Sequence, residues 1–186
     1  MPSKLSLISD DYGRAGRLGR VHVVVAPEDQ PPFSIDAIAV EEDTHLLLSS
    51  EGAIDEPKET FAELVSAAAE RQPETPGSVL VRKAEPLEFL AIVHDIDCEP
   101  TWREAWIASA INGIVEEAEW RQLEAIGMPL LGTRHGHIEG RRVALWLARC
   151  LSRARFRHLK RIWVVAPPGS ETELMWVLRN EFGDRR

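Results

Sequence analysis

The stretch MPLLGTRHGHIEG (residues 128–140) places a glycine-rich loop directly after an apolar run, and the helix-like segment RRVALWLARCL follows it. The apolar run at 125–131 predicts a short buried strand, and residues 141–155 carry apolar side chains at helical spacing. A strand, a loop and a helix in this order are typical of α/β proteins. The loop combines flexible backbone with the donors of a threonine, an arginine and two histidines, so it is either a tight turn or the first candidate for a ligand site.

The rest of the chain also alternates between strand and helix signals. Predicted strands lie at 21–26, 35–40, 78–84, 89–96 and 161–167, and predicted helices lie at 60–72, 101–122 and from Ser170 onward. Thr101 with Glu104, and Ser170 with Glu173, have the spacing of a capping box. Trp163 lies inside a continuous apolar strand and is expected to be buried. Such strands between amphipathic helices predict a mixed or mostly parallel sheet flanked by helices on both faces.

Length and composition fit one globular domain. The chain has 186 residues, 44% of them hydrophobic and 28% charged. We expect residues 21–186 to form the domain, and residues 1–20 to be a disordered arm or an extra edge strand. No apolar run approaches the roughly 20 residues of a membrane span, and the N-terminus lacks the apolar core of a signal peptide. A cytoplasmic location without membrane contact is therefore expected.

Charge and cysteine content limit the partners. The net charge of −8 argues against general nucleic-acid binding. Residues 134–161 are nevertheless strongly basic. This region is either a solvated helix face or a local field that attracts an anionic ligand, with RNA a minor alternative. Two cysteines without a CxxC spacing give neither a disulfide framework nor a zinc motif.

Two histidine-containing clusters are weak candidates for metal binding or catalysis. In HDIDC (94–98) strand alternation places His94 and Asp95 on opposite faces, which argues against a shared metal ion. Cys98 is a possible nucleophile with His94 as its base, but no third group that would orient His94 is evident. His135 and His137 lack a third metal ligand nearby. The sequence therefore predicts no metal site, no cofactor and no catalytic residue.

In open α/β sheets, ligands bind outside the carboxyl ends of the strands, and the segments at those ends resemble one family. The chain resembles the macro domain superfamily of ADP-ribose-binding α/β proteins. The resemblance covers residues 21–182 in five ordered segments. These are IDAIAV (35–40) for the family's "vDAIVN" strand, HLLLSSEGAI (45–54) for its glycine-rich loop, PGSVLVRKAEPLEFLAIVHDID (76–97) for its strand pair, WIASAINGIVEEA (106–118) for the next helix, and MPLLGTRHGHIEGRRVALWL (128–147) for the second ligand loop and its helix.

The resemblance implies a three-layer α/β/α macro-domain-like fold with ligand residues on two loops. In the second loop, backbone amides would wrap the diphosphate and distal ribose, and the first loop would close over the same groups. The residues at these positions are Asp43, Ser49, Ser50, Glu51, Gly52, Ala53, Ile54, Gly132, Thr133, Arg134, His135, Gly136, His137 and Ile138.

Departures from the family pattern leave three functions open. Val40 and Asp43 replace two asparagines, a serine pair and Glu51 replace a glycine run, and Asp29 is the substitute for the family's adenine-contacting aspartate. One hypothesis is a reader or sensor that binds ADP-ribose, a related NAD-derived nucleotide or an ADP-ribosylated partner. A second is a ligand-free module for protein interaction. A third is hydrolysis of an ADP-ribose derivative, with Asp43 or Glu51 positioning water, although the usual hydrolase residues are not matched.

Overall fold

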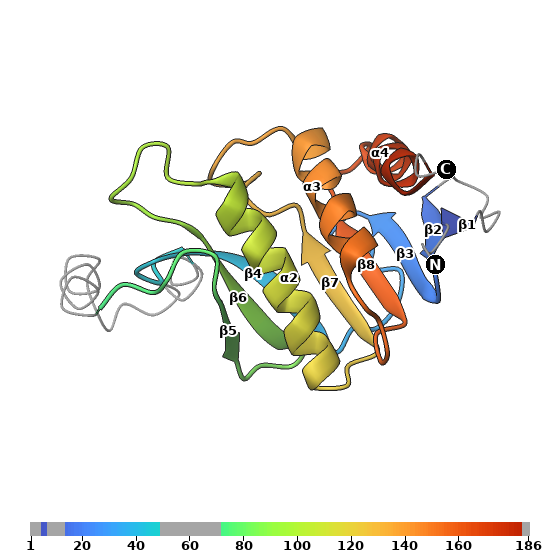
Figure 1. Cartoon of the computed structure of the whole chain (residues 1–186), viewed down its shortest axis with the longest axis horizontal. Helices are drawn as coiled ribbons and strands as arrows, with labels where there is room; N and C mark the ends of the chain where they lie inside the picture. The colour runs from blue at the N-terminus through green and yellow to red at the C-terminus, as the bar shows by residue number, and fades with distance from the viewer. Residues whose placement is uncertain (1–4, 7–13, 49–71, 184–186) are drawn as a thin grey trace.

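Eight strands form one mixed sheet in the part of the chain described by the computed structural model, residues 5–6, 14–48 and 72–183. The strand order is β1-β2-β3-β8-β7-β4-β6-β5 (Figure 1). The strands are β1 (Leu5–Ser6), β2 (Ala15–Leu18), β3 (Val21–Ala26), β4 (Ala37–Asp43), β5 (Val79–Arg82), β6 (Leu87–His94), β7 (Ala125–Pro129) and β8 (Arg161–Val165). The helices are α2 (Glu104–Trp120), α3 (Gly140–Arg153) and α4 (Glu171–Gly183).

The five central strands run parallel, and the strands at both edges run antiparallel to their neighbours. β3, β8, β7, β4 and β6 pair in parallel, whereas β1 pairs antiparallel with β2, β2 with β3, and β5 with β6. This arrangement confirms the predicted mixed, mostly parallel sheet. As a consequence, the carboxyl ends of these five strands all lie at the same end of the sheet.

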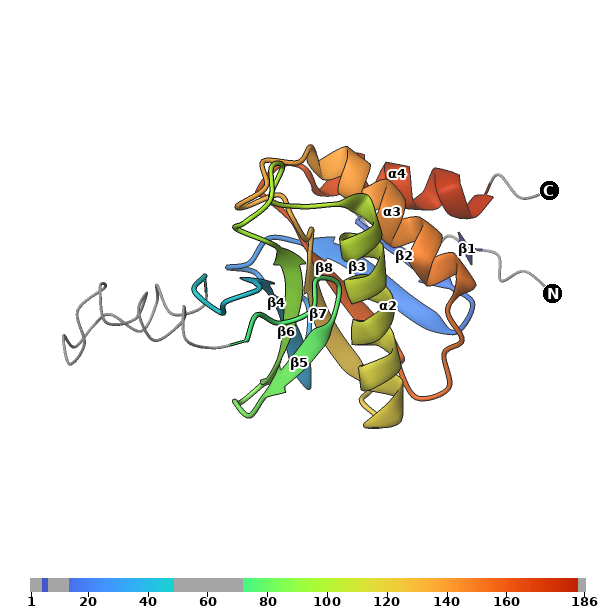
Figure 2. The same cartoon turned by 60° about the vertical axis from the view of Figure 1, so that its left-hand side comes forward.

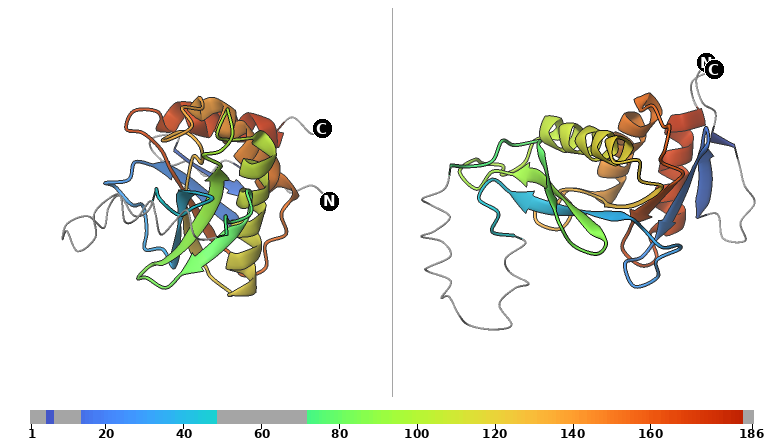
Figure 3. Two further views of the ribbon diagram at one scale, coloured as in Figure 1. Left: turned by 90° about the vertical axis from the view of Figure 1, so that its left-hand side faces the viewer. Right: turned by 90° about the horizontal axis from the view of Figure 1, so that it is seen from below.

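One face of the sheet carries the main apolar core. Figures 2 and 3 show α2 and α3 side by side on this face, with α4 next to α3. Ile126 and Met128 of β7 are fully buried there, in the same cluster as Val143 and Leu147 of α3. These apolar side chains recur at helical spacing in α3, as the sequence predicts.

Trp163 belongs to the opposite face. Strand alternation places Gly127 on that face too, and a Cβ built at Gly127 would lie 3.3 Å from Ile35 Cδ1 and 3.4 Å from Trp163 Cε3. The absence of a side chain at Gly127 therefore gives the indole its space. Trp163 is only 3% exposed, and its Nε1 donates to the Ala26 carbonyl at 2.9 Å, so the prediction that it is buried is confirmed.

Most predicted elements have counterparts at slightly different bounds. The predicted strands at 78–84 and 89–96 are the antiparallel pair β5 and β6, and residues 15–18 form β2 beside β3. The strand predicted at 35–40 begins at Ala37 and continues to Asp43 as β4. The helix predicted at 60–72 lies outside the described residues.

The capping box predicted at Thr101 is wrong. Helix α2 begins at Glu104, its N-cap is Arg103, and no side chain caps it. The Thr101 hydroxyl instead lies 3.3 Å from His94 Nδ1, because residues 101–103 are still crossing from the end of β6 to the helix. Among the described helices, none has the length and apolar character needed to cross a membrane.

Candidate functional site

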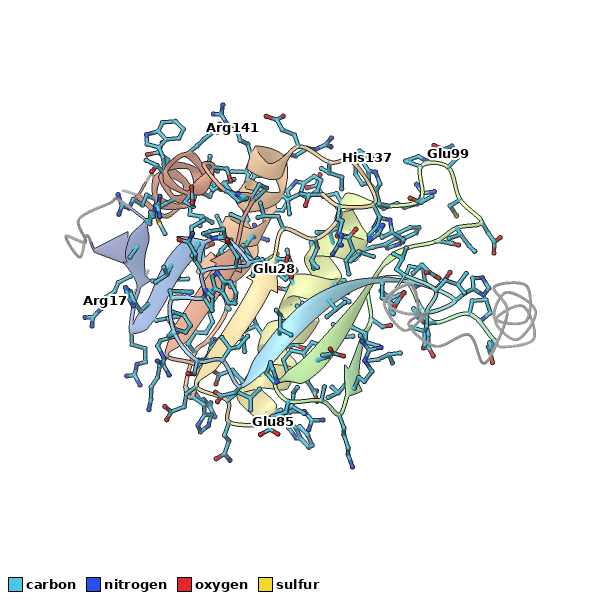
Figure 4. All side chains as sticks on the ribbon, turned by 180° about the vertical axis from the view of Figure 1, so that it is seen from behind. Arg17, Glu28, Glu85, Glu99, His137 and Arg141 are labelled. Atoms are coloured by element: carbon cyan, nitrogen blue, oxygen red, sulfur yellow. The ribbon has the colours of Figure 1, made fainter. Side chains whose placement is uncertain are left out.

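A cleft of about 510 Å³ lies at the end of the sheet where the parallel strands have their carboxyl ends. Segments that follow β3, β7 and β8 border it, together with residues 38–41 of β4. Figure 4 shows Glu28 and His137 toward this end and Glu85 at the opposite one. The lining residues are Glu28, Asp29, Ile38, Ala39, Val40, Glu41, Pro129, Leu130, Thr133, Arg134, Val165, Ala166, Pro167 and Pro168.

The cleft combines apolar walls with a few charged groups. Most lining side chains are aliphatic or proline, and the charged exceptions are Glu28, Asp29, Glu41 and Arg134. Glu28 and Asp29 are exposed, so water screens them well. An apolar concave surface with a small number of polar groups is typical of small-molecule sites.

Glu41 differs from the other charged residues because its carboxylate is almost completely buried. Its side chain is 8% exposed, and its two oxygens accept three hydrogen bonds. Oε1 lies 2.6 Å from His94 Nε2 and 3.2 Å from the His135 amide nitrogen. Oε2 accepts from the Gly132 amide at 2.7 Å. The carboxylate thus joins the end of β4 to β6 and to the loop after β7.

These hydrogen bonds determine the charge of Glu41. Burial by itself would raise its pKa, but the hydrogen bond from His94 and the amides of Gly132 and His135 together hold the pKa below its usual value of 4.5. Glu41 is therefore ionised at neutral pH. An ionised carboxylate only accepts hydrogen bonds, so His94 Nε2 is the donor in this pair.

His94 connects Glu41 to a hydroxyl. Its side chain is 3% exposed, Nδ1 faces Thr101 Oγ1, and the ring meets the His135 ring edge-on at 6.1 Å between centroids. Carboxylate, imidazole and hydroxyl follow one another in the order of a hydrolytic triad. Thr101 does not line the cleft, so we assign His94 a positioning role, holding the Glu41 carboxylate against the loop.

The loop after β7 needs its glycines for its own packing. Gly132 has a φ of +84°, and a Cβ there would lie 2.5 Å from Ile138 Cδ1. At Gly136 a Cβ would lie 2.7 Å from the Gly132 carbonyl oxygen and 2.8 Å from Trp102 Cδ1. Real Cβ atoms do not approach other atoms this closely, so any side chain at either position would distort the loop.

The loop amides fall into two groups. Those of Gly132 and His135 donate to Glu41, that of Thr133 donates to the Leu130 carbonyl, and that of Ile138 donates to the Gly132 carbonyl. Within the described part of the chain, the amides of the remaining residues have no acceptor. These are Arg134, Gly136 and His137.

Of the seven loop residues predicted to bind a ligand, two line the cleft. These two are Thr133 and Arg134. Ile138 is 7% exposed and belongs to the apolar core, and His137 has a positive φ of 51°. Gly132, His135, Gly136 and His137 do not line the cleft.

Asp43, predicted for the first loop, is fully buried at the end of β4. Its Oδ1 accepts from the His45 amide at 2.6 Å, and its Oδ2 accepts from the amides of Leu47 and Leu48 at 2.9 and 3.0 Å. The carboxylate thus fixes the turn that leaves β4. The other predicted first-loop residues, Ser49 to Ile54, lie outside the described residues.

Sequence reasoning missed Glu41 and its link to His94. The available signal was an acidic residue directly after the apolar run 35–40, at the carboxyl end of a parallel strand. Glu28 was missed as a lining residue, whereas Asp29 was named and does line the cleft. Its proposed contact with adenine remains a prediction.

The cysteines do not form part of this site. Cys98 Sγ donates to Asp95 Oδ2 at 3.1 Å, and this hydrogen bond raises the pKa of the thiol. A raised pKa disfavours the reactive thiolate, and Cys150 is buried beside α2. Over residues 14–48 and 72–183, no group of three His, Cys, Asp or Glu side chains is arranged to hold a metal ion.

No protein-family model and no curated protein sequence matches the chain. Solved structures do match it. The macrodomain of Oceanobacillus iheyensis with ADP superposes with a TM-score of 0.65 at 14% identity, covering 87% of this chain and 92% of that one. The macrodomain of Thermus aquaticus DarG has a TM-score of 0.56 at 16% identity, covering 78% and 98%. The macro domain of ganglioside induced differentiation associated protein 2 superposes with a TM-score of 0.63 at 12% identity, covering 90% of this chain and 87% of that one.

Proposed function

Because the chain has the macrodomain α/β/α fold, we propose that it binds ADP-ribose or a related NAD-derived nucleotide, as a reader or sensor, in the cleft at the carboxyl ends of β3, β4, β7 and β8. The observation that carries the proposal is the position of this cleft, bordered by Thr133 and Arg134 of the glycine-rich loop. The Oceanobacillus macrodomain has been solved with ADP and, as a mutant, with ADPR. An ADP-ribosylated protein would present the same group.

The dimensions and chemistry of the cleft support this proposal. Its volume of about 510 Å³ falls within the range of small-molecule sites. The Arg134 guanidinium can form charge-assisted hydrogen bonds to a phosphate, and the Arg134 amide, which has no acceptor among the described residues, is a further donor at the cleft. At the other side of the cleft, the Asp29 carboxylate can accept a hydrogen bond from the adenine amino group.

Calorimetric titration with ADP-ribose tests the proposal. We expect the wild-type chain to bind, and a Val40→Trp variant to lose binding, because Val40 is a partly exposed lining residue and an indole there fills the cleft. Ala84→Trp is the matched control, since it adds the same indole to an exposed position at the opposite edge of the sheet. Absence of binding by the wild type, or equal loss in both variants, contradicts the proposal.

Gly136→Glu is a poor probe of phosphate binding. A side chain at this position would collide with the Gly132 carbonyl oxygen and with Trp102, so lost binding would report a distorted loop. Val40→Trp avoids this collision because Val40 lies in β4 and is not part of the loop.

One observation favours a second candidate, a ligand-free module for protein interaction. The Glu41 carboxylate occupies two amides of the glycine-rich loop, and these amides would otherwise be free for an external anion. Under this alternative the wild-type chain gives no heat with ADP-ribose. Hydrolysis is not proposed, because Asp43 is fully buried, does not line the cleft and accepts backbone hydrogen bonds on both oxygens. Glu51, the other residue expected to position water, lies outside the described residues.

A further inference from the structure

The glycine-rich loop already holds an anion, which is supplied by the chain itself. The amide nitrogens of Gly132 and His135 lie 2.7 and 3.2 Å from the two oxygens of one carboxylate, that of Glu41. Backbone amides that converge in this way form an anion-binding concavity. The Glu41 side chain therefore occupies the place that a phosphate oxygen or an external carboxylate would take.

We propose that Glu41 is a specificity-determining residue, which disfavours a phosphate beside the Gly132 loop and makes the cleft prefer the uncharged nucleoside part of its ligand. This inference rests on the proposed nucleotide binding and concerns the same cleft. It names the part of the ligand that supplies the affinity.

The first argument is competition for donors. A phosphate that used the Gly132 and His135 amides would have to displace Glu41. The displaced carboxylate would also lose its bond from His94, and the space around it is closed, since only 8% of the Glu41 side chain is exposed. A buried charge without its partners is strongly disfavoured, so Glu41 keeps the amides.

The second argument is charge repulsion. Glu41 lines the cleft, and its lowered pKa keeps it ionised while a ligand approaches. Repulsion between like charges is strongest where water is excluded, and Glu41 is the buried carboxylate among the charged lining residues. Arg134 offsets this repulsion only in part, because its side chain is exposed and water screens its charge, whereas the Glu41 carboxylate is buried.

The neutral part of the cleft suits a nucleoside. Val40, Leu130, Val165 and Pro167 supply apolar surface, against which a base and a ribose can pack without a charge to accommodate. The carboxylates of Glu28 and Asp29 accept hydrogen bonds, so they can bind the amino and hydroxyl donors of adenosine. They have no hydrogen to donate to a phosphate oxygen.

The test compares two ligands on the same proteins by calorimetry, using the full chain. For the wild type we expect adenosine to bind at least as tightly as ADP-ribose. In Glu41→Gln and Glu41→Ala the negative charge is removed, so the affinity for ADP-ribose relative to adenosine should rise about tenfold, equivalent to about 1.4 kcal/mol. Glu116→Gln removes an exposed charge from α2 and should leave the ratio unchanged.

The ratio separates a change in specificity from a change in folding, since a damaged cleft weakens both ligands together. An unchanged or lower ratio in both Glu41→Gln and Glu41→Ala, with both ligands still bound, overturns this inference and leaves the proposed function standing. Absence of binding of either ligand to the wild type and to all variants overturns the proposed function and this inference with it.

Discussion

Glu41→Gln tests whether the buried carboxylate holds the loop in place. The substitution preserves the size of the side chain but replaces one oxygen by an NH₂ group. Glu41 serves three donors, with His94 and His135 on Oε1 and Gly132 on Oε2. Whichever way the glutamine amide is rotated, its NH₂ group faces at least one backbone N–H, and that donor loses its acceptor.

The expected cost follows from these contacts. A partly buried donor without an acceptor costs about 1–3 kcal/mol, and the remaining bonds lose the strengthening that an ionised acceptor provides. We therefore expect the free energy of unfolding at pH 7 to fall by about 2–3 kcal/mol, as measured by urea denaturation. Domains of this size have about 5–15 kcal/mol in total, so the variant should still fold and can be used in ligand titrations.

The pH dependence gives an independent check on the same residue. The pKa of Glu41 in the folded state is below the ordinary 4.5, so its contribution is complete above about pH 4.5 and is lost as the pH falls through the folded-state pKa. The difference between wild type and Glu41→Gln should therefore shrink below pH 4.5, where a protonated Glu41 resembles glutamine. A difference at pH 7 smaller than about 0.5 kcal/mol, or one that persists unchanged in acid, would refute the assigned role.

Three further outcomes are expected. Gly132→Ala should lower the free energy of unfolding by about 2–4 kcal/mol in urea titrations, because φ is +84° and the new Cβ would lie 2.5 Å from Ile138 Cδ1; a cost below 1 kcal/mol contradicts the loop geometry. Glu119→Gln should lower the free energy of unfolding by about 1–2 kcal/mol in the same assay, because the carboxylate accepts hydrogen bonds from three consecutive amides, those of residues 157–159. The same amides hold the pKa of Glu119 below 4.5, against the effect of burial. An unchanged free energy of unfolding at pH 7 would show that these hydrogen bonds are unimportant for stability. Arg134→Ala should weaken ADP-ribose binding about tenfold in calorimetry by removing a charge-assisted contact, and unaltered affinity would exclude Arg134 from the ligand site.

The sequence predicts the central sheet well because its pattern is local. The run IWVV (162–165) of β8 is continuously apolar, which is typical of a strand buried on both faces, and Trp163 is indeed buried. The periodic apolar positions of α3 likewise predict the face that packs on the sheet. Such patterns do not depend on which strands become neighbours.

The bounds of β4 and α2 depend on distant contacts, and here the sequence was insufficient. Three consecutive acidic residues after Val40 are typical of a loop, yet they continue β4 to Asp43 because they pair with residues 91–94 of β6. Their carboxylates all accept backbone hydrogen bonds, which makes their burial possible. Thr101 has the spacing of a capping residue, but it faces His94 instead. In both cases the contact that determines the local structure is made with residues of another segment, so it could not be predicted from local patterns.

The link between Glu41 and His94 could not be predicted for the same reason. The two residues are 53 positions apart and meet only because β4 and β6 are adjacent parallel strands, in a register that pairs Glu41 with Ala91 and Asp43 with His94. Strand order in a sheet does not follow from local patterns, so the carboxylate most important to the candidate site was not identified from sequence.

Backbone-amide NMR during titration with ADP-ribose tests the central claim most directly, because it reports binding and its location together. We expect shifts that saturate with ligand at Val40, Thr133, Arg134 and Ala166, which line the cleft, and none at Ala84 on the opposite edge. Absence of shifts at saturating ligand, or shifts that map away from the cleft, would contradict nucleotide binding at this site.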